Sequence, residues 1–161
     1  MKRLAHACAA CALLACVSSP AAGAGWKLLD PAPTRADATS FLATVARQVI
    51  ANEYGAAWDS LYPAHQLVAP RDEYVACERK SPIPGRLDRI AAVRAWWAPV
   101  KVAGQTERVR GVRVTFFLRI VDPTSGGAVE LRPTFAAVWI GWRWAWMLPQ
   151  ARYEMYAADS C

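Results

Sequence analysis

The sequence predicts an α+β fold in which N-terminal helices pack in a strongly curved antiparallel sheet. Up to about residue 80, apolar residues recur at the spacing of amphipathic helices. From Arg86 onward the apolar period changes to two, which is typical of strands with one buried face. Turn residues, among them the cluster at 123–127 and Gly141, divide this second part into short strands. We therefore expect a sheet that bends around the first, long helix.

Three helices are expected before the sheet. The first has Asp37 or Thr39 as its cap, because these side chains can bind the free N–H groups of a helix start. Pro63 stops the second helix, and Pro70 opens the third, where proline suits the first turn. The expected bounds are 37–53, 56–62 and 70–80.

The strands are predicted from alternation and from prolines. Residues 87–97 form an apolar first strand that Pro99 closes. In the second strand, Val112, Val114, Phe116, Leu118 and Ile120 alternate with polar or outward residues. Val109 is out of phase with this set, so a bulge is expected near Gly111.

The last strands are predicted to be aromatic. A third strand has one face formed by Val129, Leu131, Phe135 and Ala137, and Pro133 marks an edge position or a bulge there. A final hairpin turns at Gly141, and the period of two places Trp142, Trp144 and Trp146 on one face. The residues after it form a tail that carries Cys161 toward the third helix.

Residues 1–24 have the pattern of a cleaved signal peptide. Lys2 and Arg3 precede an uncharged apolar stretch that is too short to span a bilayer, and Ala22-Gly23-Ala24 is a small-residue cleavage site. Leu13-Leu14-Ala15-Cys16 also resembles a bacterial lipobox, so Cys16 is a possible lipidation site and both processing routes stay open. Residues 25–37 are then a leader or tether, and 38–161 one domain. The protein is expected to be exported to the periplasm, the cell surface or the medium, and to meet a membrane only through a lipid anchor.

Two cysteines lie in the predicted domain, Cys77 and Cys161. In an oxidising compartment two cysteines most simply form one disulfide. A metal site or a nucleophilic pair is the alternative, but residues 25–161 hold one histidine and no Cys-x-x-Cys. We therefore predict a disulfide, no metal and no cofactor.

Charge and motifs argue against several classes of function. The formal net charge is +6, or +4 without Lys2 and Arg3, and the basic residues are scattered, so no nucleic-acid partner is expected. The sequence has no Gly-rich phosphate loop, Gly-x-Ser-x-Gly elbow or paired-carboxylate motif, which argues against a nucleotide enzyme or a hydrolase.

Three stretches resemble the nuclear transport factor two-like superfamily, in particular its small bacterial envelope and lipoprotein members. They are EYGAAWDSLYPAH at 53–65, RDEYVACE at 71–78 and GWRWAW at 141–146. The resemblance spans about 40–161 and implies a cone or cystatin-like fold with a cavity open at one end. Ketosteroid isomerases, polyketide cyclases and dehydratases of this superfamily place Asp, His or Tyr in the cone, whereas other members only bind ligands or partners. Many dimerise through the outer face of the sheet.

Candidate catalytic residues are His65, with Asp59 and Tyr62 nearby at helical spacing. The alternative for His65 is structural, since it follows Pro63 in an expected turn where a ring nitrogen can bind backbone groups. The alternative for Asp59 is a solvated helix position.

Candidate ligand-binding residues are Trp58, Trp96, Trp97, Phe116 and Arg113. The aromatic ones can line a pocket or pack in the core, and Arg113 can meet an anion or face solvent on a strand. A row of exposed tryptophans would instead indicate glycan binding. On the outer face, Phe117 and Val121 are expected to be exposed in a monomer, which points to a possible homodimer.

The sequence thus predicts an exported, non-catalytic module of the bacterial envelope that binds a small apolar ligand in a cavity or interacts with an envelope protein. The alternative is an isomerase, cyclase or dehydratase that uses His65.

Overall fold

The fold is described by a computed structural model for residues 32–161. The predicted signal segment 1–24, the lipidation site Cys16 and residues 25–31 of the leader lie outside the described residues. In chain order the elements are α1 (Arg35–Ile50), α2 (Tyr54–Asp59), α3 (Pro63–Val68), α4 (Arg71–Glu78), β1 (Arg86–Lys101), β2 (Arg108–Val121), β3 (Ala128–Leu131), β4 (Thr134–Trp139), β5 (Trp144–Trp146) and α5 (Gln150–Ala157).

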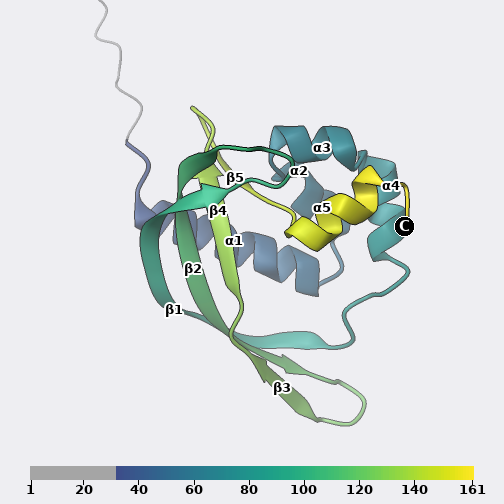
Figure 1. Ribbon diagram of the computed structural model, residues 1–161. Coiled ribbons are helices and arrows are strands. Elements are labelled where there is room, and N and C mark those ends of the chain that lie inside the picture. Colours follow the sequence, from purple (N-terminus) through teal and green to yellow (C-terminus); the bar gives the residue numbers. More distant parts are fainter. Residues whose placement is uncertain (1–31) are drawn as a thin grey trace, which may run out of the picture.

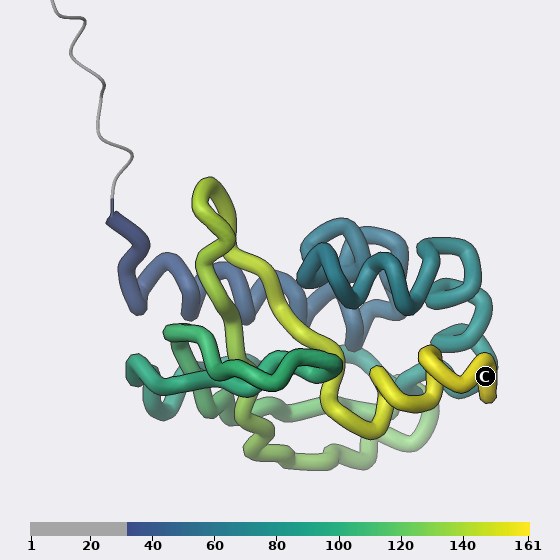
Figure 2. The backbone as a smooth tube through the Cα atoms, turned by 45° about the horizontal axis from the view of Figure 1, so that its top comes forward, coloured from purple at the N-terminus to yellow at the C-terminus, as the bar shows by residue number. Residues whose placement is uncertain are grey.

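The strands form one antiparallel sheet in the order β1-β2-β4-β5, and β3 pairs with the far end of β2. Helix α1 lies across one face of this sheet, and the four shorter helices gather at one end of the molecule (Figure 1). Turned by 45°, the backbone shows α1 and the long strands as two layers (Figure 2). The predicted α+β class with an antiparallel sheet is confirmed.

Helix α1 begins two residues before the earlier of its predicted caps. Thr34 is the cap: its hydroxyl oxygen accepts from the backbone N–H of Asp37, and the Asp37 carboxylate accepts from the N–H of Thr34. This capping box satisfies two N–H groups that the helix cannot bond itself. Asp37 is therefore the third residue of the helix, and the predicted leader, which extended to residue 37, overlaps α1.

The segment after α1 holds three short helices instead of two. Pro63 begins α3, where its missing N–H costs nothing in the first turn. His65 therefore lies in a helix and not in the expected turn. Helix α4 begins after Pro70, close to its predicted start, and the expected C-terminal tail forms α5.

Strand β1 continues through Pro99, which was predicted to end it. β1 is an edge strand, and an edge strand tolerates a residue without an N–H. The register shifts lie in β1, between Leu87 and Arg89 and between Ala92 and Arg94. The bulge predicted near Gly111 is therefore wrong. A glycine is needed there because the strands approach closely: a Cβ at this position would lie 2.5 Å from the carbonyl oxygen of Ala137.

The apolar set predicted for β2 is buried against α1 in one continuous core. Pro133 divides the predicted third strand into β3 and β4, and its carbonyl accepts from the N–H of Phe116. Trp142 lies in the turn after Gly141 and is 72% exposed, so it does not share a face with Trp144 and Trp146. The turn removes it from the strand alternation.

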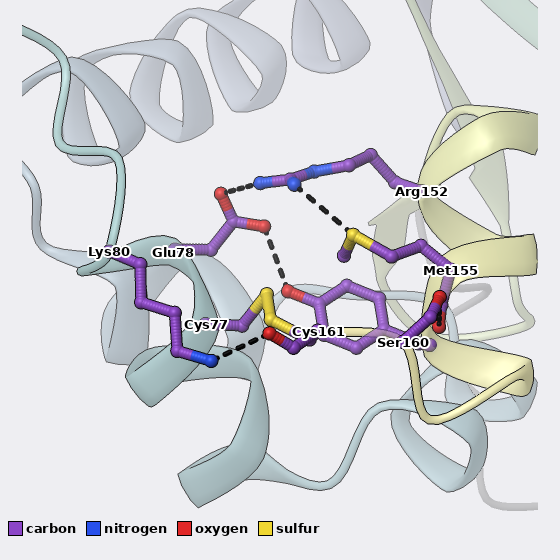
Figure 3. The surroundings of a disulfide bond; sticks show 8 residues. Cys77, Glu78, Lys80, Arg152, Met155, Ser160 and Cys161 are labelled. Atoms are coloured by element: carbon purple, nitrogen blue, oxygen red, sulfur yellow. Dashed lines mark hydrogen bonds and ion pairs between the residues drawn. A yellow bond between two sulfur atoms is a disulfide. The ribbon is translucent and has the colours of Figure 1, made fainter.

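The predicted pairing of Cys77 with Cys161 is present, with their Cα atoms 5.8 Å apart. It joins α4 to the chain that follows α5. Beside it, the Glu78 carboxylate accepts from Arg152 and, at 2.8 Å, from the Tyr156 hydroxyl (Figure 3). The sulfur bridge and these polar contacts hold α5 against α4.

Trp144 and Trp146 are a matched pair in the core, 6% and 8% exposed. The Nε1 of Trp146 donates to the carbonyl oxygen of Ala57 in α2 at 2.7 Å. The Nε1 of Trp144 is buried without a hydrogen-bond partner among residues 32–161. The two side chains thus lose similar packing on replacement by phenylalanine but different hydrogen bonds.

We therefore expect Trp146→Phe to lower the free energy of unfolding by about 1 kcal/mol more than Trp144→Phe, the net value of one hydrogen bond. Urea denaturation followed by circular dichroism measures both variants against the parent protein. Equal losses for the two variants would show that the Trp146–Ala57 bond does not stabilise the fold.

Candidate functional site

His65 is completely buried at a junction of three segments. Its Nε2 lies 3.1 Å from the carbonyl oxygen of Ala103, in the loop between β1 and β2. Its Nδ1 accepts from the backbone N–H of Leu148, after β5, at 3.1 Å. The neutral ring with the proton on Nε2 satisfies both contacts, because Nδ1 needs its lone pair to accept.

Aromatic rings complete this junction. The rings of Tyr62 and Tyr153 pack against the imidazole, with centroids at 5.6 and 5.1 Å. The Tyr153 hydroxyl lies so close to Gly104, whose φ is +76°, that no Cβ fits there. The β1–β2 loop is therefore held against α3 and α5 by close packing as well as by the bond to His65.

The contacts of His65 are those of a structural residue, whose ring nitrogens bind backbone groups and not a substrate. Burial lowers the pKa of His65 below its usual 6.5, and the hydrogen bond to Ala103 opposes this only in part. Because both ring nitrogens are bonded and the ring has no exposed surface, no nitrogen is left to take a proton from a substrate.

The other two catalytic candidates do not complete a proton-transfer site. The Asp59 side chain is 60% exposed and pairs with Arg71 at 3.4 Å. Tyr62 touches the imidazole with its ring edge, but its hydroxyl accepts from the Gln105 amide at 3.2 Å. The structure brings Tyr62 to His65 as a packing partner and leaves Asp59 at the surface.

Three of the ligand-binding candidates pack in or against the hydrophobic core. Phe116 is buried in the core between β2 and α1. Trp58 donates from Nε1 to the carbonyl oxygen of Ala69 at 2.6 Å, and Trp97 packs 6.1 Å from Trp144. These aromatic side chains fill part of the region between α1 and the sheet, and a cleft of about 340 Å³ remains there between α1, β1 and Phe116.

The remaining two candidates meet on the other face of the sheet. Strand register places Trp96 directly opposite Arg113. On this outer face the guanidinium of Arg94 lies 4.7 Å from the Trp96 ring, and that of Arg89 lies 5.7 Å from the ring of Phe117. We call this surface the basic–aromatic face and define it by Arg89, Ala91, Arg94, Trp96, Arg113 and Phe117.

A cleft of about 280 Å³ opens at the end of this face, next to the His65 junction. Two of its lining residues, Ala103 and Leu148, are the backbone partners of His65. Its polar lining comes from Lys101, Arg113, Thr134 and Gln150 and its apolar lining includes Val100, Ala136, Met147 and Pro149.

Sequence reasoning missed Lys101 and Gln150 as site residues. Lys101 lies beyond Pro99, where the strand was predicted to have ended, and Gln150 begins a helix that was predicted to be a tail. Only the folding of the β1–β2 loop onto α3 and α5 brings these positions together, and no local pattern marks that long-range contact.

No family model, curated protein or solved structure matches this chain. Within residues 32–161, no three His, Cys, Asp or Glu side chains come together in a group able to hold a metal ion. No helix in the same part of the chain is long and apolar enough to cross a membrane.

The lowered pKa of His65 makes stability depend on pH in a defined direction. Below about pH 6.5 the ring takes up a proton in the unfolded chain, whereas in the folded chain it does so only at a lower pH, so the free energy of unfolding falls as the pH decreases between the two pKa values. Between the pKa values of the unfolded and the folded chain, the free energy of unfolding changes by up to about 1.4 kcal/mol per pH unit.

A variant without the imidazole separates this contribution from that of the carboxylates. We expect His65→Gln to be less stable than the parent at neutral pH and to lose less stability from about pH 7 to pH 5. Urea denaturation at several pH values measures the difference between the two profiles. Parallel profiles would contradict the buried, neutral histidine.

Proposed function

We propose that this protein is an exported, non-catalytic module that binds an acidic partner protein of the bacterial envelope through the basic–aromatic face. The observation that carries the proposal is the gathering of arginine and aromatic side chains there, exposed or half-buried, with arginines over the rings. Helix α1 packs on the opposite side of β1 and β2 (Figures 1 and 2).

The composition of this face is that of a protein-binding surface. Tryptophan and arginine are enriched among the residues that dominate binding energy at interfaces. An arginine over an aromatic ring is held in place by the cation–π attraction and still offers N–H groups to a carboxylate. Arg94 on Trp96 is the closest such pair of the face.

Charge favours an acidic partner over a second copy of the chain. Arg119 is balanced by Asp88 at 3.7 Å and lies opposite Glu130, whereas Arg89, Arg94 and Arg113 have no ion pair within residues 32–161. In a symmetric dimer through this face, the patch that carries these three cations would meet its own copy, and this like-charge juxtaposition costs binding energy. The homodimer expected from the sequence is therefore not the partner that we propose.

Two further points support a binding role in the envelope. The signal-like segment 1–24 and a cysteine pair within disulfide distance both suit an oxidising compartment. Release after Ala24 and lipid anchoring at Cys16 fit this proposal equally. The bonded and buried His65 favours binding over the isomerase, cyclase or dehydratase alternative.

We also propose that the sheet and α1 form the cone-shaped fold that the sequence resemblance implies. β1 and β2 bend as they pass α1 (Figure 1), and the register shifts of β1 supply points where a strand can bend. With Phe116, Trp58 and Trp97 packed in its interior, such a cone would still offer its outer face for binding.

Site-specific photo-crosslinking in the native host tests the partner. A benzophenone amino acid in place of Ala91 reports from the centre of the face, and one in place of the exposed Glu73 of α4 is the matched control. We expect a discrete cross-linked protein from position 91 alone, which disappears when Arg89 and Arg94 are both changed to Glu.

Two outcomes would contradict the proposal. A cross-link of twice the chain mass would show that the face binds a second copy. No cross-link from position 91, in cells where the protein is correctly processed, would show that the face has no partner.

A further inference from the structure

We infer that the cleft next to His65 binds the carboxylate end of a small amphipathic molecule, with Arg113 and Lys101 holding the carboxylate. This ligand site does not depend on the partner proposed above, although Arg113 lies at the border of both surfaces. The charge, the apolar lining and the size of the cleft all fit such a ligand.

The charge in the cleft is of one sign. Its lining includes the cations Lys101 and Arg113 and no Asp or Glu. The nearest turn of α5 carries Glu154, but that carboxylate accepts from the Gln150 amide and does not line the cleft. An anion entering here meets two cations and no repelling carboxylate.

Arg113 differs from the other arginines of the outer face. Arg89 and Arg94 lie over aromatic rings, and Arg119 is paired with Asp88. Arg113 is half-buried, yet in the described part of the chain it has neither an ion pair nor a hydrogen bond from its guanidinium. A partly desolvated guanidinium gains most from a ligand that accepts two parallel N–H bonds, and a carboxylate has that geometry.

The floor of the cleft is apolar. Val100, Ala103 and Leu148 are each at most 5% exposed, and Met147 and Pro149 form part of the wall. Above this buried floor, an apolar chain attached to the carboxylate would cover the exposed parts of Met147 and Pro149 and gain from leaving water. A bare inorganic anion would leave it uncovered.

The size of the cleft limits the ligand. At roughly 30 Å³ per water molecule, about 280 Å³ holds roughly nine waters, or a ligand of about ten non-hydrogen atoms. Octanoate has this size and chemistry, and it serves as the probe.

The cleft is also formed in advance. His65 bonds the backbone of Ala103 on one side and of Leu148 on the other, so both walls are tied to one buried ring. A site that is already ordered does not lose binding energy to ordering its own loops.

Tryptophan fluorescence offers a direct titration, because Trp146 lines the cleft. We expect octanoate to bind saturably and octanol, which lacks the charge, to bind at least about tenfold more weakly. Arg113→Gln and Lys101→Gln should each weaken octanoate binding about tenfold, while Arg94→Gln, on the same face outside the cleft, should leave it unchanged. Circular dichroism and thermal unfolding confirm that each variant is folded.

A second series identifies the source of the carboxylate. A short apolar peptide with a free C-terminus is compared with octanoate and with its own amidated form. Displacement of octanoate by the free peptide assigns the cleft to protein C-termini, and binding of octanoate alone assigns it to fatty carboxylates. Displacement of octanoate by the amidated peptide as strongly as by the free peptide would overturn the inference, because the carboxylate would then not be recognised.

Two further results would overturn it. They are the absence of saturable octanoate binding at millimolar concentration, and octanoate binding that is unchanged in both Arg113→Gln and Lys101→Gln. Failure of the partner proposal gives a different result: position 91 yields no cross-linked partner, while octanoate binding and its dependence on Lys101 persist.

Discussion

The pair of hydrogen bonds to the buried ring of His65 is the contact on which the end of the molecule depends. It joins α3, the β1–β2 loop and the chain after β5, three segments that are far apart in the sequence. The ring can bond both partners only while it is neutral, because Nδ1 must accept and Nε2 must donate. Because both ring nitrogens are engaged in these bonds, His65 holds the three segments together and does not act as an acid or base.

A second attachment lies on the other side of α5. The Cys77–Cys161 bond, together with Glu78 between Arg152 and Tyr156, ties the last helix to α4 (Figure 3). The histidine fixes the chain that enters α5, and the cysteine fixes the chain that leaves it. Because α5 begins at the cleft, these two attachments also determine where Gln150 and Pro149 stand in its wall.

Local pattern predicted the fold class and the core strand well. The alternation through β2 identified its buried face, and the redox argument identified the cysteine pair. Two prolines differ from the prediction, since Pro63 starts a helix and Pro99 lies within an edge strand, and both outcomes depend on spatial neighbours that local pattern does not show. Aromatic residues indicated a pocket, but whether Phe116 or Trp97 lines a cavity or fills it is decided by the helix packed against it. Trp96 and Arg113 lie 17 positions apart in the sequence, and the pairing register of β1 with β2 places them directly opposite each other.

The most direct test of this account is the protonation state of His65 in the folded protein. Nitrogen-15 NMR of the imidazole distinguishes the two neutral tautomers from each other and from the cation. We predict a neutral ring with its proton on Nε2 and a pKa below the usual 6.5, because burial disfavours the cation. A ring that titrates near 6.5, or that carries its proton on Nδ1, would contradict the hydrogen bonds assigned to Ala103 and Leu148 and the architecture that depends on them.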